Sequence, residues 1–95
     1  MFNNPRYITN GIKADIPLHL QIVIWNMVDT MTIDPIDYLQ VFCLSEYKGM
    51  QKIVHTQEVP EYENVLLLNS ESPIVAKIYL MDDTDHSTML LSNEY

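Results

Sequence analysis

Residues 16–33 read IPLHLQIVIWNMVDTMTI and hold the only long apolar pattern of helical period and the only tryptophan of the chain. On a helical wheel these residues form one broad apolar face, of the kind that packs on a sheet. Its members are Leu20, Val23, Ile24, Met27, Val28 and Met31. Pro17 suits the first turn of a helix, and Pro35 disfavours helical geometry in the residue before it. We therefore predict one main helix over about residues 17–33.

A second, narrower apolar stripe lies on another side of this helix. It consists of Leu18, Ile22 and Trp25, with Asp29 at its end, and is called the helix stripe below. A tryptophan flanked by aliphatic residues is typical of the anchors of protein interfaces. Two interpretations remain open: a loop of the same chain, such as residues 59–68, covers the stripe as part of the core, or another protein binds it.

From residue 37 the apolar period changes from helical to alternating. Residues 38–47 and 50–58 are rich in aromatic and β-branched residues, and Lys48-Gly49 between them can form a two-residue turn. In such a hairpin the numbers of paired residues sum to 97, so Phe42 lies opposite His55. Both faces of this hairpin are partly apolar. We expect the helix to cover one face and loops or a partner to cover the other.

Shorter patterns on either side complete the predicted sheet. Residues 6–14 are expected to form a first strand, in which Gly11 indicates a bulge or a close backbone approach. Residues 65–68 are either a strand or a plug in the core, and residues 74–81 and 86–91 alternate like a final strand pair. We therefore predict a single α+β domain, residues 1–95, with one main helix on a mostly antiparallel sheet of four to five strands.

Composition restricts the class of protein. The N-terminus has no export signal, and no apolar run approaches the length that spans a bilayer, so we expect a cytoplasmic protein without membrane contact. The single cysteine, Cys43, lies in a strand-like run and is expected to be a small buried residue in a reducing compartment.

The net charge of −8 is concentrated in the second part of the chain. Residues 58–95 contain eight acids and one base, against five acids and four bases in residues 1–57. Such a balance repels the nucleic-acid backbone, so no direct binding of DNA or RNA is expected. The acidic part could instead attract a basic protein partner.

Several blocks of the chain resemble a known family. These are Asn4 to Thr9, Ile16 to Gln21, Asp37 to Phe42, Gln51 to Tyr62 and His86 to Leu91, with Gln-Lys-Ile-Val-His at 51–55 the most specific. The pattern is similar to family number 960 of the bacterial domains of unknown function, which are short Gram-positive proteins. The resemblance implies a stand-alone cytoplasmic protein with no assigned activity, and it supplies no catalytic residues.

The residues contain one set that could bind a metal ion. His55, His86 and the acidic turn with Asp82, Asp83 and Asp85, together with Glu58, could hold a divalent ion if the two hairpins met in space. The spacing matches no metal motif. The alternative is an ordinary acidic hairpin turn followed by His86 at the start of a strand, with a half-buried His55 elsewhere that bonds a backbone carbonyl. A metal-dependent hydrolase or metal-binding protein is therefore the second hypothesis for the function of the chain.

The first hypothesis for its function is a non-enzymatic interaction or regulatory protein. The chain contains no recognisable catalytic constellation, and its two glycines exclude a glycine-rich phosphate loop. No catalytic residue and no cofactor is therefore predicted. The expected partner is another protein or a second copy of the chain, bound through the helix stripe, an open sheet edge or the acidic part.

Overall fold

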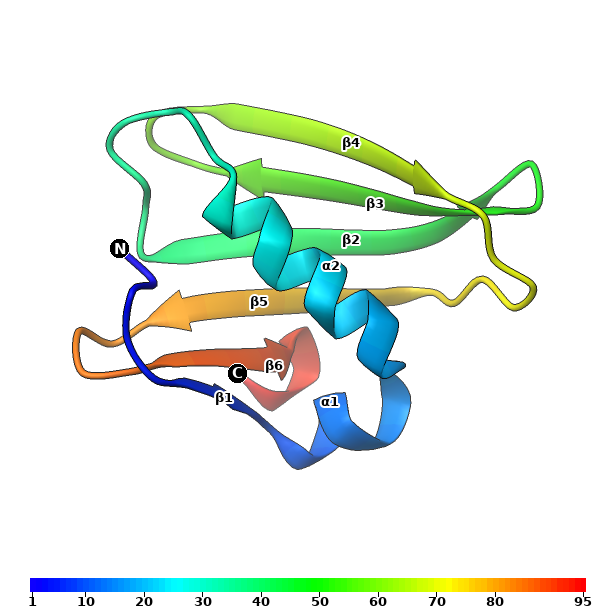
Figure 1. Cartoon of the computed structure of the whole chain (residues 1–95), viewed down its shortest axis with the longest axis horizontal. Helices are drawn as coiled ribbons and strands as arrows, with labels where there is room; N and C mark the ends of the chain where they lie inside the picture. Colours follow the sequence, from blue (N-terminus) through cyan, green and yellow to red (C-terminus); the bar gives the residue numbers. More distant parts are fainter.

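Most of the apolar stretch at residues 16–33 forms a helix across one face of a six-stranded sheet in the computed structural model, which describes residues 1–95 (Figure 1). The elements in chain order are β1 (Arg6–Ile8), α1 (Asn10–Asp15), α2 (Leu18–Asp29), β2 (Leu39–Tyr47), β3 (Met50–Gln57), β4 (Tyr62–Leu68), β5 (Ala76–Asp82), β6 (Ser87–Leu91) and the 3₁₀ turn η1 (Ser92–Glu94). The α+β class is confirmed. The predicted count of four to five strands was too low, because the two uncertain edge segments, Arg6–Ile8 and Tyr62–Leu68, both form strands.

The strands lie in the order β1-β6-β5-β2-β3-β4. All neighbours pair antiparallel except β1 and β6, which are parallel. The central hairpin has the predicted register, with Phe42 opposite His55 and Cys43 opposite Val54. The two-residue turn at Lys48-Gly49 therefore fixed the faces of both strands, as expected from its length.

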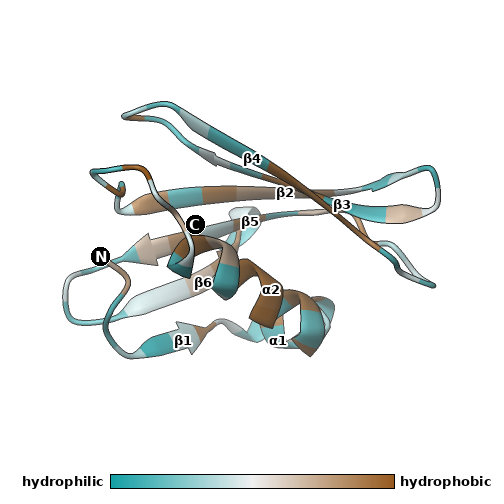
Figure 2. Ribbon diagram, turned by 45° about the horizontal axis from the view of Figure 1, so that its top comes forward, coloured by the Kyte–Doolittle hydropathy of each residue, from teal (hydrophilic) through white to brown (hydrophobic).

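The helix α2 packs its broad apolar side on the sheet (Figure 2). The buried residues of the helix are Leu20, Gln21, Ile24, Met27 and Val28, and those of the sheet include Phe42, Leu44, Ile53, Ile78 and Leu80. The helix ends at Asp29 rather than near residue 33. The hydroxyl of Thr30 donates to the Asn26 carbonyl at 2.9 Å, and Met31 reaches the margin of the core from the loop that follows.

The predicted first strand is shorter than expected, because residues 10–15 form α1 instead. Thr9 caps this helix by accepting the N–H of Ile12 at 3.3 Å. Ile12 and Ile16 lie one turn apart and are both buried, which an extended chain would not achieve. Gly11 shows the predicted close approach, since its N–H donates to the Glu94 carboxylate at 3.2 Å. A Cβ at this position would lie 2.6 Å from that carboxylate.

No α-helix covers the opposite face of the sheet (Figure 2). We call this face the open face; it includes Val41, Cys43, Val54, Val65, Leu67 and Tyr79. The prediction that Cys43 is buried was wrong. Its neighbours Phe42 and Leu44 point toward α2, so the alternation of the strand places Cys43 in solvent. None of the helices combines the length and apolar character needed to cross a bilayer.

Candidate functional site

The helix stripe lies on the side of α2 that faces away from the sheet. The side chains of Leu18 and Ile22 are 69% and 60% exposed, and Trp25 beside them is half-buried. Because Leu18 and Ile22 are four residues apart on a helix, they are neighbours on its surface. The structure thus brings together the residues that were predicted as a binding surface.

The alternative interpretation was that residues 59–68 cover this stripe. Instead, Tyr62–Leu68 forms β4 and pairs with β3 along its length, from Tyr62 opposite Gln57 to Leu68 opposite Gln51. That strand is the edge of the sheet, so it is not available to cover α2. The aliphatic residues of the stripe are therefore left exposed by the rest of the described chain.

The aromatic end of the stripe is held by Arg6 of β1. The Arg6 guanidinium carbon lies 4.6 Å from the centroid of the Trp25 ring, and the group also forms an ion pair with Asp29. Its second nitrogen donates to the other Asp29 oxygen at 3.1 Å. A planar guanidinium suits this combination of ring stacking and bidentate carboxylate contact. Arg6 therefore fixes the orientation of Trp25 and joins β1 to α2.

A second polar arrangement lies inside the sheet, on the face that α2 covers. Gln40 donates through Nε2 to the Asp37 carbonyl at 2.9 Å and to Oε1 of Gln57 at 2.7 Å. Gln57 in turn donates to the carbonyls of Pro35 and Pro60 at 3.2 and 3.0 Å. These buried amides satisfy carbonyls of two loops and attach both loops to the sheet.

His55 completes this network. Because both amide hydrogens of Gln40 are used, its Oε1 accepts a hydrogen bond from Nε2 of His55 at 2.7 Å. This leaves Nδ1 as a buried acceptor without a partner. Burial lowers the pKa of His55 to about 4, so the imidazole is neutral at pH 7. The sequence suggested a partly buried His55 bonded to a backbone carbonyl, whereas it is fully buried and bonded to a side chain.

The structure does not assemble the predicted metal site. His55 is buried between the rings of Phe42 and Tyr62, whereas His86 is half-exposed at the β5–β6 turn beside Asp83, with 3.5 Å between Nε2 and Oδ2. No group of three or more potential ligands is close enough to hold an ion.

The acidic turn has a different role. Burial alone would raise the pKa of Asp82, but hydrogen bonds from the backbone of Phe2 and Thr84 and from the Asn4 amide, with the positive N-terminus, lower it. The bond from the Phe2 N–H is 2.7 Å long. Asp82 therefore anchors the N-terminal segment, whose Phe2 is buried in the core.

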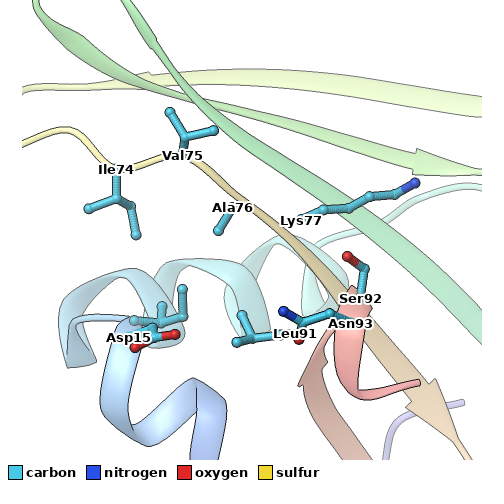
Figure 3. A pocket seen from close by; sticks show the side chains of 9 residues that line it. Asp15, Ile74, Val75, Ala76, Lys77, Leu91, Ser92 and Asn93 are labelled. Carbon is cyan, nitrogen blue, oxygen red and sulfur yellow. The ribbon is translucent and has the colours of Figure 1, made fainter.

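A shallow pocket of about 210 Å³ lies where α1 leads into α2, beside the start of β5 and the end of β6. Figure 3 shows Ile74, Ala76 and Leu91 directed into it, with Asp15 at its rim and Lys77 extending away. Pockets that bind small molecules usually have volumes of 300–1,000 Å³. This pocket is below that range, and Asp15 and Lys77 are the only ionisable residues that line it.

Comparison with known proteins identifies the family of this chain. A family model described as "Staphylococcal protein of unknown function (DUF960)" matches residues 5–94. The chain belongs to the DUF960 family. The family resemblance found in the sequence blocks is therefore confirmed.

A solved structure supports the fold of this DUF960 protein. It is described as a protein of unknown function from Enterococcus faecalis, with a TM-score of 0.85 and 25% sequence identity over 97% of this chain and 91% of that chain. No curated protein matches the chain. Neither the family model nor the solved structure assigns an activity.

Two structural features of this DUF960 protein were not predicted from the sequence. The glutamine network could have been found, because Gln40 shares the strand parity of Phe42, and Gln57 shares that of Ile53. Arg6 had no such signal. Its contact with Trp25 depends on β1 lying beside β6, a parallel pairing that no local pattern indicates.

Proposed function

We propose that this DUF960 protein is a non-enzymatic protein-interaction module that binds an apolar segment of another protein through its helix stripe. The observation that carries the proposal is the exposure of Leu18 and Ile22, 69% and 60%, side by side on a helix whose other side is anchored in the core. Apolar groups on a rigid helix form recurring recognition surfaces, because little conformational entropy is lost on binding.

The neighbouring Trp25 supports this role. Its ring is half-buried, and the guanidinium of Arg6 lies over it and restricts its orientation. Preorganised aromatic residues dominate the binding energy of many interfaces. The binding surface therefore combines two exposed aliphatic side chains, Leu18 and Ile22, which can adjust to a partner, with Trp25, whose orientation is restricted.

The charge of the molecule defines the chemistry of the partner. Asp15 precedes the stripe, within a chain of net charge −8, whereas Asp29 at its other end is paired with Arg6. The acidic residues 58–95 add a longer-range attraction for basic groups, which salt screens over about 10 Å at 0.1 M ionic strength. The proposed partner is therefore a protein segment with apolar anchors next to lysine or arginine residues.

The test compares the double variant Leu18→Ser/Ile22→Ser with the control Val75→Ser, which changes a residue that is 82% exposed and lies outside the helices. A partner captured by crosslinking the wild-type protein is purified, and its affinity is measured by calorimetry. We expect the double variant to lose affinity by roughly 30-fold or more, since the few residues that dominate an interface each cost more than about 1 kcal/mol when truncated.

Binding of the purified partner should also weaken as salt rises, while Val75→Ser should bind like wild type. Unfolding midpoints of both variants should stay close to wild type, because all three residues are exposed. Equal affinity of the double variant and the wild type would contradict the proposed surface. The metal-dependent alternative has no support in this arrangement, because His55 and His86 are not brought together.

A further inference from the structure

The two edges of the sheet differ in how well they are protected. At one edge β1 has only three residues, Arg6–Ile8, and the chain turns into α1 directly after it. At the other edge β4 has seven, Tyr62–Leu68, and no strand lies on its outer side (Figure 1). An edge strand of that length presents a row of unpaired N–H and C=O groups that can template another strand.

The outer strand has few of the features by which proteins block such pairing. Its sequence, YENVLLL, has no proline and no lysine, and Glu63 is its only charged residue. The pairing with β3 runs residue by residue without a bulge. Its last four residues, Val65–Leu68, are all apolar, and Val65 and Leu67 are 48% and 41% exposed on the open face. Such an edge favours association with another strand.

We propose that β4 pairs antiparallel with β4 of a second copy of this chain, which joins the two sheets edge to edge. The occupant follows from the self-complementarity of the strand. A two-fold axis perpendicular to the sheet pairs residues of the same face, so the numbers of opposed residues must have an even sum. Only a few registers meet this condition.

The register with a sum of 132 matches the side chains best. Leu66 then lies opposite Leu66 of the second copy, and Val65 lies opposite Leu67 on the open face. Glu63 lies opposite Asn69, the first residue after the strand, rather than opposite its own copy, and Asn64 lies opposite Leu68. Glu61 and Glu71 would face each other only outside β4. With a sum of 130, Glu63 would lie opposite Leu67 instead. Matched apolar pairs stabilise adjacent strands, whereas like charges directly opposite destabilise them.

The dimer is independent of the helix stripe. The helix α2 crosses the sheet and leaves the C-terminal half of β4 free on its outer side (Figure 1). Because the contact consists mainly of one strand from each copy, its buried area is small, and the dimer should dissociate on dilution. A dimer through β4 therefore leaves Leu18 and Ile22 free for the partner proposed above.

The register is tested by single cysteines in a Cys43→Ser background, which removes the exposed native thiol. Under oxidised glutathione, Leu66→Cys should form a disulfide-linked dimer at least tenfold faster than Val65→Cys or the collision control Val75→Cys. An equimolar mixture of Val65→Cys and Leu67→Cys should crosslink faster than either alone. Absence of a Leu66→Cys dimer above the control, or faster crosslinking of Val65→Cys alone, would overturn the proposal.

Light scattering after size exclusion measures the unmodified interface. The wild-type mass should rise from 11.1 kDa toward twice that value with concentration. Val65→Lys/Leu67→Lys should remain monomeric, since both positions are exposed and tolerate lysine in a folded chain. Leu18→Ser/Ile22→Ser should dimerise like wild type, which separates this proposal from the helix stripe. A wild-type monomer at millimolar concentration, or a dimer that only the helix variant abolishes, would overturn it.

Discussion

His55 shows how a single residue links the core to pH. It is fully buried, stacks on Phe42 with ring centroids 4.2 Å apart, and gives its only N–H to Gln40. The burial that lowers its pKa to about 4 from the usual 6.5 means that the unfolded chain binds a proton more readily than the folded one. Stability from the neutral imidazole is therefore present above pH 6.5 and is lost as the pH falls toward 4.

We expect the free energy of unfolding to fall by about 2 kcal/mol between pH 7 and pH 5 on account of His55, given a shift of this size. Urea unfolding at several pH values measures this loss. His55→Gln should flatten the slope, because an amide can donate to Gln40 but does not titrate in this range. His86→Gln, which removes a half-exposed histidine, should keep the slope. The same slope in His55→Gln and wild type would refute the assignment.

At the scale of elements, the contact of Arg6 with Trp25 and Asp29 joins the shortest strand to the main helix. The strand β1 has three residues and pairs only with β6, so its own ladder supplies few hydrogen bonds. The ion pair is partly exposed, with 30% and 45% of the two side chains accessible, and solvent reduces its contribution. The contact of Arg6 with the Trp25 ring also contributes to stability, and salt weakens it less than it weakens the ion pair.

Arg6→Met keeps the aliphatic stem and removes the charge. We expect a loss of about 1 kcal/mol in stability, which combines a weak exposed ion pair with a cation–π contact. Chemical unfolding measures the loss, and Lys13→Met serves as control because Lys13 is an exposed base in no ion pair. Trp25 fluorescence should shift at the same time. Equal stability of the two methionine variants would argue against this contact.

At the scale of the whole molecule, acidic residues far outnumber basic ones. The chain has 13 acids and 5 bases, and Arg6–Asp29 is the only ion pair between an arginine or lysine and a carboxylate. The remaining acids repel one another more strongly in the compact state than in the extended chain. Folding therefore proceeds against the net charge and depends on the apolar layer between α2 and the sheet.

Added salt should stabilise the protein by screening this repulsion. We expect the thermal midpoint at pH 7 to rise by a few degrees between low ionic strength and 0.5 M sodium chloride. Calorimetry measures the midpoint, and sodium perchlorate at equal ionic strength separates screening from anion-specific effects. A midpoint that falls with both salts would show that attractive pairs outweigh the repulsion.

The central elements could be predicted because their signals are local. The helical period of residues 16–33 identified the side of α2 that packs on the sheet. The two-residue turn at Lys48-Gly49 determined the register of β2 and β3, since turn length alone sets which residues face each other. The family could likewise be recognised from short blocks of sequence, because such blocks depend only on the order of residues along the chain.

What the chain alone determined about this protein is thus its class, its central hairpin and the helix stripe as a unit. Only the tertiary structure decided that Leu18 and Ile22 stay exposed, that His55 and His86 are separated, and that Cys43 faces solvent. Each of these depends on which distant segment packs on which face or edge of the sheet. Strand order is set by the packing of whole faces over long sequence separations, for which a short window of residues contains no periodic signal.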